Sequence, residues 1–316
     1  MILNYDHYRT GQRRRGRRTV VISLAAGAVV ILAALAVVLK VPAKLLDPGA
    51  MRQAPGKLPD LWKAGSYEGV ISAADSLLKG DPLNATALSY RGFACFYRAA
   101  AENAFEEKLP YLDESIVSLR RALLVGTPFI GEADYILGKA YFYKGKYYYD
   151  ESITFMESSL AKGYVQKDSN EYIGLAYSQL GDYEKGMQYF LTALKEDSGD
   201  LLLLTIGQTY YQMKRTADAV DYLLRTLNKT DDKAIEKRAR FLLGEIYLDR
   251  NELFKAEEQY ATIVKIDPQS ADAHFFLGEV YAKMNDPVKA RAEWRNALII
   301  DPSHYGAKLR YYTGRR

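Results

Sequence analysis

Cysteine and histidine are nearly absent from this chain of 316 residues. It has one Cys, at position 95, and three His, at positions 7, 274 and 304. A single thiol excludes a disulfide framework and a Cys-rich zinc module, and the three His are too far apart for the spacings of common metal sites. We therefore expect neither a metal site nor a cofactor.

The signature motifs of several enzyme classes are missing as well. The sequence has no phosphate-binding loop, no dinucleotide-binding fingerprint and no His-Glu-x-x-His run. Residues 76–79 and 159–162 match Ser-x-x-Lys, but the other motifs of the penicillin-binding enzymes do not follow them. The sequence predicts no catalytic residues and a protein that is not an enzyme.

Acidic residues are scarce at both ends of the chain. Residues 1–18 contain six Arg against Asp6 alone, and residues 308–316 contain four basic residues and no acidic one. The net charge of the whole chain is only +4, so the residues in between are net acidic. They leave no broad basic face, and we expect no nucleic acid to bind.

Charged residues are also absent from positions 19–39. As a helix this apolar run would be about 31 Å long, which matches the ~30 Å hydrocarbon core of a bilayer. Six Arg precede the run, whereas only Lys40 and Lys44 follow closely. The positive-inside rule then predicts a basic cytoplasmic tail (1–18), a single transmembrane helix (19–39) in the inner, cytoplasmic membrane, and a periplasmic or other extracytoplasmic body.

A cleavable signal peptide is the alternative for the same segment. Residues 34–36, Ala-Leu-Ala, offer a cleavage site, but the apolar run is longer than a usual signal core of about 7–15 residues and continues to Leu39. The retained anchor is favoured, and cleavage stays open. Ser23 and Gly27 form one small-xxx-small pair, so self-association also stays open. Residues 40–59 are rich in Pro and Gly and are predicted to form a stalk.

Two segments near the C-terminus repeat one pattern with a period of 34 residues. Each carries, in the same order, Leu-Gly, a Tyr, a small residue, an aromatic residue and a Pro. The members are Leu243, Gly244, Tyr247, Ala256, Tyr260 and Pro268, then Leu277, Gly278, Tyr281, Ala290, Trp294 and Pro302. This pattern resembles the tetratricopeptide repeat, a pair of antiparallel helices that buries its apolar faces only by stacking on its neighbours.

Weaker copies of the pattern extend the resemblance towards the N-terminus, with Gly92, Gly138, Gly174 and Gly207 in the Leu-Gly position. The resemblance implies an all-α fold, a tetratricopeptide α-solenoid with a right-handed superhelix, of six to seven repeats over 60–304. The expected repeats are 51–84 (degenerate), 85–130 (with an insertion around 99–109), 131–166, 167–199, 200–236, 237–270 and 271–304. Residues 305–316 are expected to form a basic C-terminal cap with a solvent-tolerant outer face.

The resemblance also implies a binding groove, because the first helix of each repeat lines the concave side of such a solenoid. The exposed positions of these helices are predicted to be Tyr90, Phe93, Tyr97, Tyr135, Lys139, Phe142, Tyr143, Tyr172, Gln179, Gln208, Tyr211, Gln212, Glu245, Asp249 and Glu279. The groove would change along its length from aromatic to amide-rich to acidic, with the aromatic part contributing most to binding. The alternative for each aromatic residue is a place in the repeat core.

The function implied by the resemblance is protein–protein interaction. With the predicted anchor, it gives a membrane-anchored, extracytoplasmic scaffold for assembly of a cell-envelope complex, such as a periplasmic flagellar-motor collar or a secretion or pilus machine. The alternatives are an ancillary chaperone of the export translocon and a recruiter or regulator of a cell-wall enzyme. The expected partners are proteins of such a complex and, through residues 19–39, the lipid bilayer.

Overall fold

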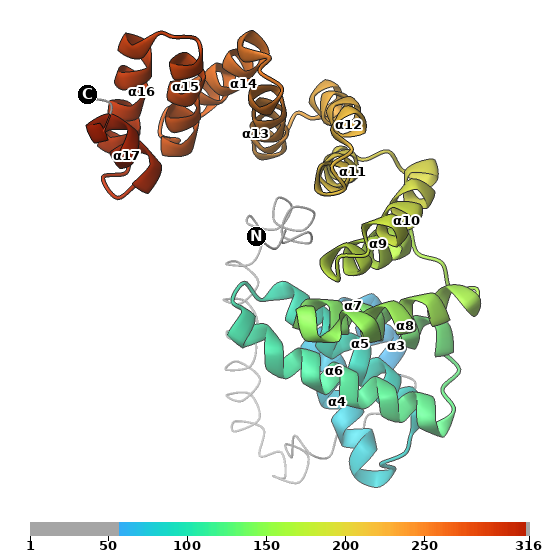
Figure 1. Cartoon of the computed structure of the whole chain (residues 1–316). Helices are drawn as coiled ribbons and strands as arrows, with labels where there is room; N and C mark the ends of the chain where they lie inside the picture. The colour runs from blue at the N-terminus through green and yellow to red at the C-terminus, as the bar shows by residue number, and fades with distance from the viewer. Residues whose placement is uncertain (1–56, 314–316) are drawn as a thin grey trace, which may run out of the picture. The chain divides into compact units, whose positions relative to one another are not determined.

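The computed structural model describes residues 57–313, which form 15 α-helices and one 3₁₀ turn and contain no strand (Figure 1). The basic tail, the predicted transmembrane helix and most of the stalk lie outside the described residues. Within 57–313, no helix combines the length and the apolar character that crossing a bilayer requires.

The described residues divide into two compact units. Residues 57–148 and 154–164 make the first unit, and residues 149–153 and 165–313 make the second. The helices of the first unit are α3 (Leu58–Lys63), α4 (Tyr67–Gly80), α5 (Ala85–Ala101), α6 (Phe105–Val125), α7 (Ile130–Lys144) and most of α8 (Tyr149–Ala161).

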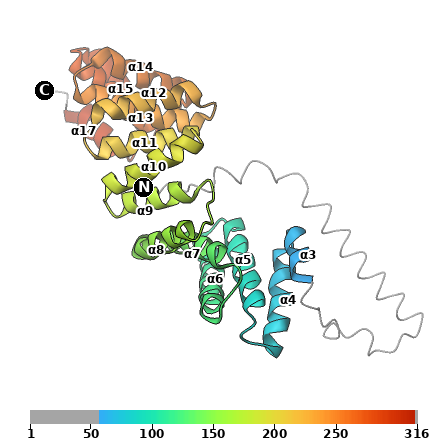
Figure 2. The same ribbon diagram turned by 90° about the vertical axis from the view of Figure 1, so that its right-hand side faces the viewer.

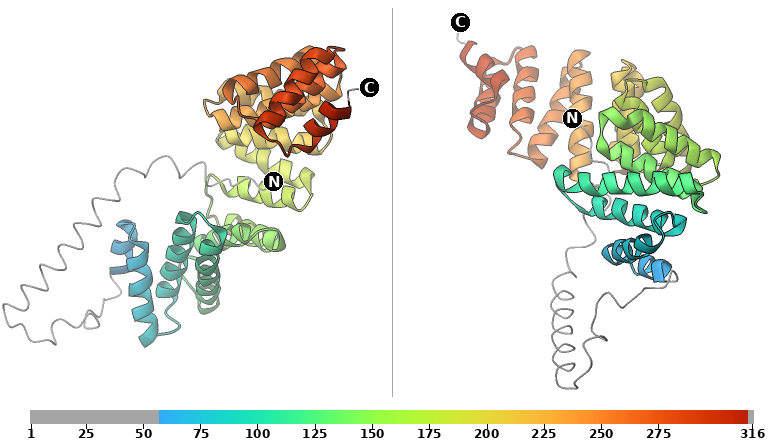
Figure 3. Two further views of the ribbon diagram at one scale, coloured as in Figure 1. Left: turned by 90° about the vertical axis from the view of Figure 1, so that its left-hand side faces the viewer. Right: turned by 90° about the horizontal axis from the view of Figure 1, so that it is seen from below.

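The second unit holds the remaining helices, which pair in chain order. They are α9 (Ser169–Gln179), α10 (Tyr183–Glu196), α11 (Asp200–Gln212), α12 (Thr216–Lys229), α13 (Lys233–Asp249), α14 (Leu253–Ile266), α15 (Ala271–Lys283), α16 (Pro287–Ile300) and α17 (Tyr305–Thr313). Figure 2 and Figure 3 show that each of these helices lies beside the next along the chain. The unit is therefore a stack of helix pairs.

One contact recurs in every complete pair, between the Gly of the first helix and a large side chain of the second. The pairs are Gly92 with Leu119, Gly138 with Met156, Gly174 with Phe190, Gly207 with Leu223, Gly244 with Tyr260 and Gly278 with Trp294. A Cβ atom placed on any of these glycines would lie 2.4–3.0 Å from the facing side chain. At the five positions other than Gly207 the distance is 2.4–2.6 Å, so an added Cβ would force the facing side chain or helix to move.

The turns inside the helix pairs share a left-handed residue two positions after the first helix. It is Gly181 after α9, Lys214 after α11, Asn251 after α13 and Asn285 after α15, with φ between 58° and 87°. Glycine and asparagine accept this conformation readily, whereas lysine adopts it at a cost of roughly 1–2 kcal/mol. The turn between α11 and α12 is thus the strained member of the series.

The insertion expected around residues 99–109 takes the form of longer helices. α5 runs through Ala101 and α6 starts at Phe105, so the connection between them is short. The extra residues extend both helices, because their additional turns pack on each other and bury Leu112 and Ala99.

The C-terminal helix exposes apolar as well as basic residues. α17 leaves Tyr305, Leu309 and Tyr312 exposed to 78%, 48% and 60%. The helix instead turns Gly306 and Ala307 towards α15 and α16, because only small residues fit against the ring of Phe275. Its larger apolar residues consequently face outward.

Candidate partner-binding surfaces

Four residues predicted to line an exposed groove are buried: Phe93, Tyr135, Lys139 and Tyr172. The expectation of exposure is wrong for them. Phe93 packs on Phe129, with ring centroids 6.1 Å apart, and Tyr135 packs on Tyr164 at 5.7 Å. These contacts bury the aromatic rings in the repeat core.

Lys139 is buried because aromatic rings surround its ammonium group. Its Nζ lies 5.8 Å from the centroid of Phe96 and 5.4 Å from that of Tyr135. Attraction to the ring faces compensates part of the desolvation of the charge. Tyr172 lies in the first half of α9, where residues 169–176 are all buried.

The aromatic end of the predicted groove is organised around Trp62, which the sequence analysis did not single out. Its ring lies 5.4–6.1 Å from four others, those of Tyr67, Tyr90, Phe93 and Tyr97. Tyr90 is half-buried, and burial together with the charge of Glu132 raises its pKa. Tyr97 remains 37% exposed. Trp62 follows two prolines in a degenerate repeat, so no repeat position pointed to it.

Phe142 and Tyr143 near the end of α7 are partly buried. The Tyr143 ring lies 6.0 Å from Phe96, and the ammonium group of Lys108 lies 5.8 Å from its centroid. These rings therefore belong to the packing of the first unit, with only part of their surface open to solvent.

The amide-rich and acidic positions of the second unit are accessible. Gln208 and Tyr211 are partly exposed, and Gln212, Glu245 and Asp249 are exposed, as is Gln179 at the end of α9. Tyr211 on α11 donates a hydrogen bond from its hydroxyl to Glu245 Oε1 on α13, at 2.7 Å. We call the set Gln208, Tyr211, Gln212, Glu245 and Asp249 the amide–acid surface.

The two carboxylates of the amide–acid surface are not ion-paired with any described basic side chain. No basic side chain within residues 57–313 forms an ion pair with Glu245 or Asp249. Burial, the hydrogen bond to Glu245 and the charges of both carboxylates raise the pKa of Tyr211. The phenol thus stays protonated as a donor. The ammonium group of Lys214 lies 5.6 Å from the centroid of the same ring, so the surface has two carboxylates beside one cation.

Glu279, the last predicted groove residue, is already paired. Arg310 on α17 donates from Nε and Nη2 to its two carboxylate oxygens, at 2.9 Å and 2.7 Å. A bidentate pair of this kind neutralises the carboxylate and holds α17 against α15. The prediction did not include Arg310, because it lies in a cap whose orientation is set by packing.

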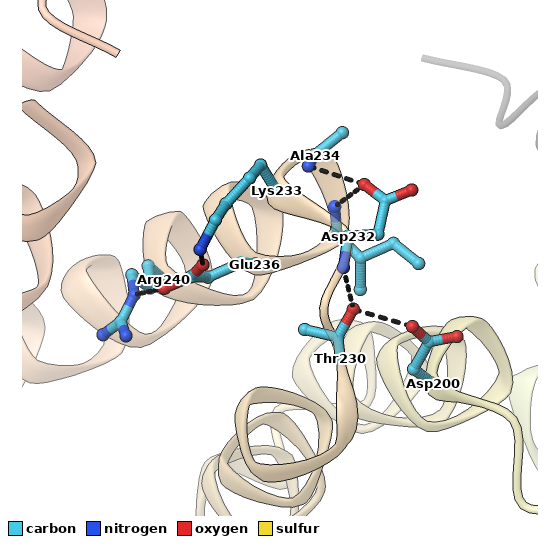
Figure 4. A network of polar contacts seen from close by, with 8 residues as sticks. Asp200, Thr230, Asp232, Lys233, Ala234, Glu236 and Arg240 are labelled. Carbon is cyan, nitrogen blue, oxygen red and sulfur yellow. Dashed lines mark hydrogen bonds and ion pairs between the residues drawn. The ribbon is translucent and has the colours of Figure 1, made fainter. Parts of the chain in front are cut away.

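A polar network at the start of α13 positions the helix that carries Glu245 (Figure 4). Thr230 donates its hydroxyl proton to Asp200 Oδ2 at 2.7 Å and accepts from the Asp232 backbone N–H at 3.1 Å. Asp232 in turn caps α13, accepting from the Ala234 N–H at 2.7 Å. The network ties α13 to the start of α11, the other helix of the amide–acid surface.

Three other titratable residues within residues 57–313 have distinctive surroundings. Cys95 is buried, and desolvation raises the pKa of its thiol to about 11. His274 Nδ1 lies 2.5 Å from Glu293 Oε2, which links α15 to α16. Glu171 is buried, its Oε2 has no hydrogen-bond partner, and burial raises its pKa to about 7. Within residues 57–313, no three His, Cys, Asp or Glu side chains are grouped to hold a metal ion.

Comparison with known families identifies the repeats. Residues 173–200, 244–285 and 271–304 match models of the tetratricopeptide repeat. The comparison with curated proteins gives no match.

The fold is similar to that of the C-terminal part of a TPR repeat-containing protein from Cytophaga hutchinsonii. The two are 16% identical, with a TM-score of 0.64 over 80% of this chain and 97% of the other. MamA from Desulfovibrio magneticus RS-1 is 19% identical, with a TM-score of 0.49 over 55% of this chain and 97% of that one. A chain of the APC/C hetero-tetramer Cut9–Hcn1 aligns at 15% identity and a TM-score of 0.49, over 82% of this chain and 48% of that chain. The present chain therefore carries tetratricopeptide repeats, and its described helices form an all-α tetratricopeptide-repeat solenoid.

Proposed function

We propose that this protein is a membrane-anchored, extracytoplasmic scaffold that holds a partner protein on the amide–acid surface. The observation that carries the proposal is the row of accessible polar groups on consecutive first helices, α11 and α13, with two carboxylates that form no ion pair with a basic residue in 57–313. Tetratricopeptide solenoids use such extended surfaces to bind other proteins. No catalytic role is proposed.

The chemistry of the surface favours a partner segment that carries Lys or Arg. The amides of Gln208 and Gln212 can donate to and accept from a partner backbone, while Glu245 and Asp249 attract a cation. Complementary charge of this kind raises the association rate and selects the partner. The aromatic end of the predicted groove contributes less, since Phe93 is buried there.

The proposed place of the protein rests on its N-terminal sequence. The uncharged run at 19–39 has the length of a membrane-spanning helix, and six Arg precede it. An anchored solenoid outside the cytoplasm suits assembly of an envelope machine for motility, pilus formation or secretion. A chaperone of the export translocon and a recruiter of a cell-wall enzyme are the alternative roles.

The binding proposal is tested by charge removal on the amide–acid surface. Full-length protein with Glu245→Gln and Asp249→Asn is expected to recover at most about a tenth of the partner that the parent recovers from gently solubilised membranes, because close charge pairs contribute about 1.5 kcal/mol or more. The matched control carries Glu184→Gln and Glu258→Gln, which remove two exposed carboxylates from the second helices α10 and α14. Equal losses in both double variants would refute the assignment of the surface.

The topology is tested by reporter fusions after Arg316. Alkaline phosphatase, which is active only outside the cytoplasm, should be active there, and a reporter that works only in the cytoplasm should be silent. The reverse pattern would refute the orientation. Release of the chain from membranes by alkaline carbonate would refute the anchor.

A further inference from the structure

The outward face of α17 has the residue pattern of a helix face that contacts another helix. Tyr305, Lys308, Leu309 and Tyr312 follow the i, i+3, i+4, i+7 spacing and lie on one stripe. Their apolar members are 78%, 48% and 60% exposed, and Lys308 makes no ion pair within residues 57–313. The opposite stripe, which includes Ala307 and Arg310, packs on the preceding repeat.

The same stripe is covered in the preceding repeat. The residues 34 positions earlier, on α15, are Ala271, His274, Phe275 and Gly278. α16, the second helix of that pair, covers two of these positions: Glu293 Oε2 lies 2.5 Å from His274 Nδ1, and the Trp294 ring lies directly against Gly278. Phe275, the counterpart of Leu309, packs instead on the following helix, against Gly306 and the ring of His304.

The stripe is covered in the repeat before that as well. On α13, Arg240 donates to Gln259 Oε1 at 2.9 Å, and Gly244 receives the ring of Tyr260, both from α14. In each pair, the polar contact and the large residue come from adjacent positions of the second helix. α17 is therefore a first helix whose stripe has no second helix within residues 57–313.

We propose that the stripe of α17 docks an acidic amphipathic helix of a partner protein, lying where the second helix of the repeat would lie. This surface is distinct from the amide–acid surface, and it extends the proposed scaffold function to a second binding site. Helix-in-groove recognition through residues at this spacing is a common mode of peptide binding.

The residues of α17 that differ from those at the same repeat positions of α13 and α15 define which side chains the incoming helix must carry. Tyr312 occupies the place of Gly244 and Gly278, so a large residue opposite it would clash, and a small residue is required there. Lys308 occupies the place of Arg240 and His274, so the residue immediately before the small one should be Glu or Asp. The docking helix thus carries an acidic–small pair between apolar positions.

Charge decides between a partner helix and a second copy of this chain. Lys308 lies on the stripe, and residues 305–313 contain no acidic residue. Two copies joined through this stripe would bring their Lys308 charges together, which is unfavourable. An acidic helix on the same stripe would meet complementary charge.

A stapled peptide tests the proposal on the full-length chain. The probe is residues 252–267 with Gln259→Glu and Tyr260→Ala, labelled with a fluorophore and stapled between positions 254 and 258, a side of α14 that is exposed. The staple supplies the helicity that a short peptide lacks in water. Two comparison peptides keep Tyr260, or carry Gln259→Lys with Tyr260→Ala.

We expect fluorescence anisotropy to show that the probe binds about tenfold more tightly than either comparison peptide, since overpacking or an unfavourable charge contact costs about 1.4 kcal/mol or more. Leu309→Glu should weaken binding by about tenfold, whereas Phe254→Glu, a change at an even more exposed apolar residue on α14, should change it less than about twofold. Lys308→Glu should restore binding of the Gln259→Lys peptide.

Three outcomes would overturn the proposal. The first is equal binding of all three peptides, and the second is an equal effect of Leu309→Glu and Phe254→Glu. The third is a concentration-dependent dimer of the parent chain that Leu309→Glu abolishes in sedimentation velocity, because it would assign the stripe to a second copy. The variant with Glu245→Gln and Asp249→Asn should bind the probe normally, so this test fails or succeeds independently of the amide–acid surface.

Discussion

Replacing Gly278 by alanine perturbs the closest helix–helix approach of the final complete repeat. A Cβ at this position would lie 2.5 Å from Trp294 Cδ1 and Nε1 and 3.1 Å from the backbone oxygen of Ala290. The indole is rigid and the carbonyl belongs to the facing helix, so neither gives way easily. The two helices must separate, or Trp294 must leave its rotamer.

The expected magnitude is the difference between two effects. Alanine favours a helix over glycine by about 1 kcal/mol, whereas overpacking a close contact costs roughly 1–3 kcal/mol. Because the overlap involves both a ring and a backbone atom, we take the upper half of that range. The net destabilisation of Gly278→Ala is then about 1–2 kcal/mol.

Two further glycines supply a graded control. At Gly207 the added Cβ would lie 3.0 Å from Leu223, a flexible side chain, and at Gly80 in α4 it would meet nothing within 4 Å. Gly207→Ala should therefore be close to neutral. Gly80→Ala should stabilise its helix by up to about 1 kcal/mol.

Hydrogen exchange followed by mass spectrometry is the appropriate assay, because repeats open locally and a global melting curve averages over them. In Gly278→Ala, the protected amides of α15 and α16 should exchange about 5- to 30-fold faster, which corresponds to 1–2 kcal/mol. If Gly278→Ala instead slowed exchange in α15 and α16, as Gly80→Ala is expected to do in α4, the close contact between Gly278 and Trp294 would be refuted.

Three other predictions follow from the second and first units. Burial, together with the charge of Asp197, raises the pKa of Glu171 from 4.5 in the unfolded chain to about 7 in the folded one. The folded state therefore binds the extra proton between these pH values, and stability is lost as the pH rises from about 4.5 to about 7. Glu171→Gln should abolish this loss of stability, measured as the protection of α9 amides from hydrogen exchange at pH 5 and at pH 8. Lys214→Gly should stabilise the turn after α11 by about 1 kcal/mol, since the backbone there has φ 61° and glycine accepts it without strain; faster exchange in α11 and α12 would contradict this. Cys95, with its buried thiol of pKa about 11, should react with iodoacetamide at pH 8 more than about a hundredfold more slowly than free cysteine, and full labelling of the native protein would contradict its burial.

The pairing of glycines with large side chains was readable from the sequence. Gly278 and Trp294 lie on two adjacent helices joined by one short turn. Their contact therefore depends on local geometry that the repeat imposes. Gly92 and Leu119 make the same contact although the insertion separates them by 27 residues instead of 16, so the fixed spacing alone did not predict it. The absence of Cys and His clusters likewise led to the expectation of no metal site.

The sequence alone could not separate surface aromatics from core aromatics. Phe93 and Tyr97 lie one turn apart on the same helix, yet the first is buried and the second is partly exposed. Trp62, from a degenerate repeat, packs against both rings, but Phe93 also packs against Phe129, at the start of the next helix pair. Neighbours from other helices decide exposure, and a pattern within one helix does not contain them.

The C-terminal helix shows most clearly which features the sequence determined and which the tertiary structure decided. Its sequence indicated a cap with basic and aromatic residues, but did not show which of these side chains would be buried. Packing set the rotation of the helix about its axis, because Gly306 allows close approach to Phe275 and Arg310 reaches Glu279. The tertiary structure thereby decided that Tyr305, Leu309 and Tyr312 face outward, where a basic cap alone would have predicted a polar surface.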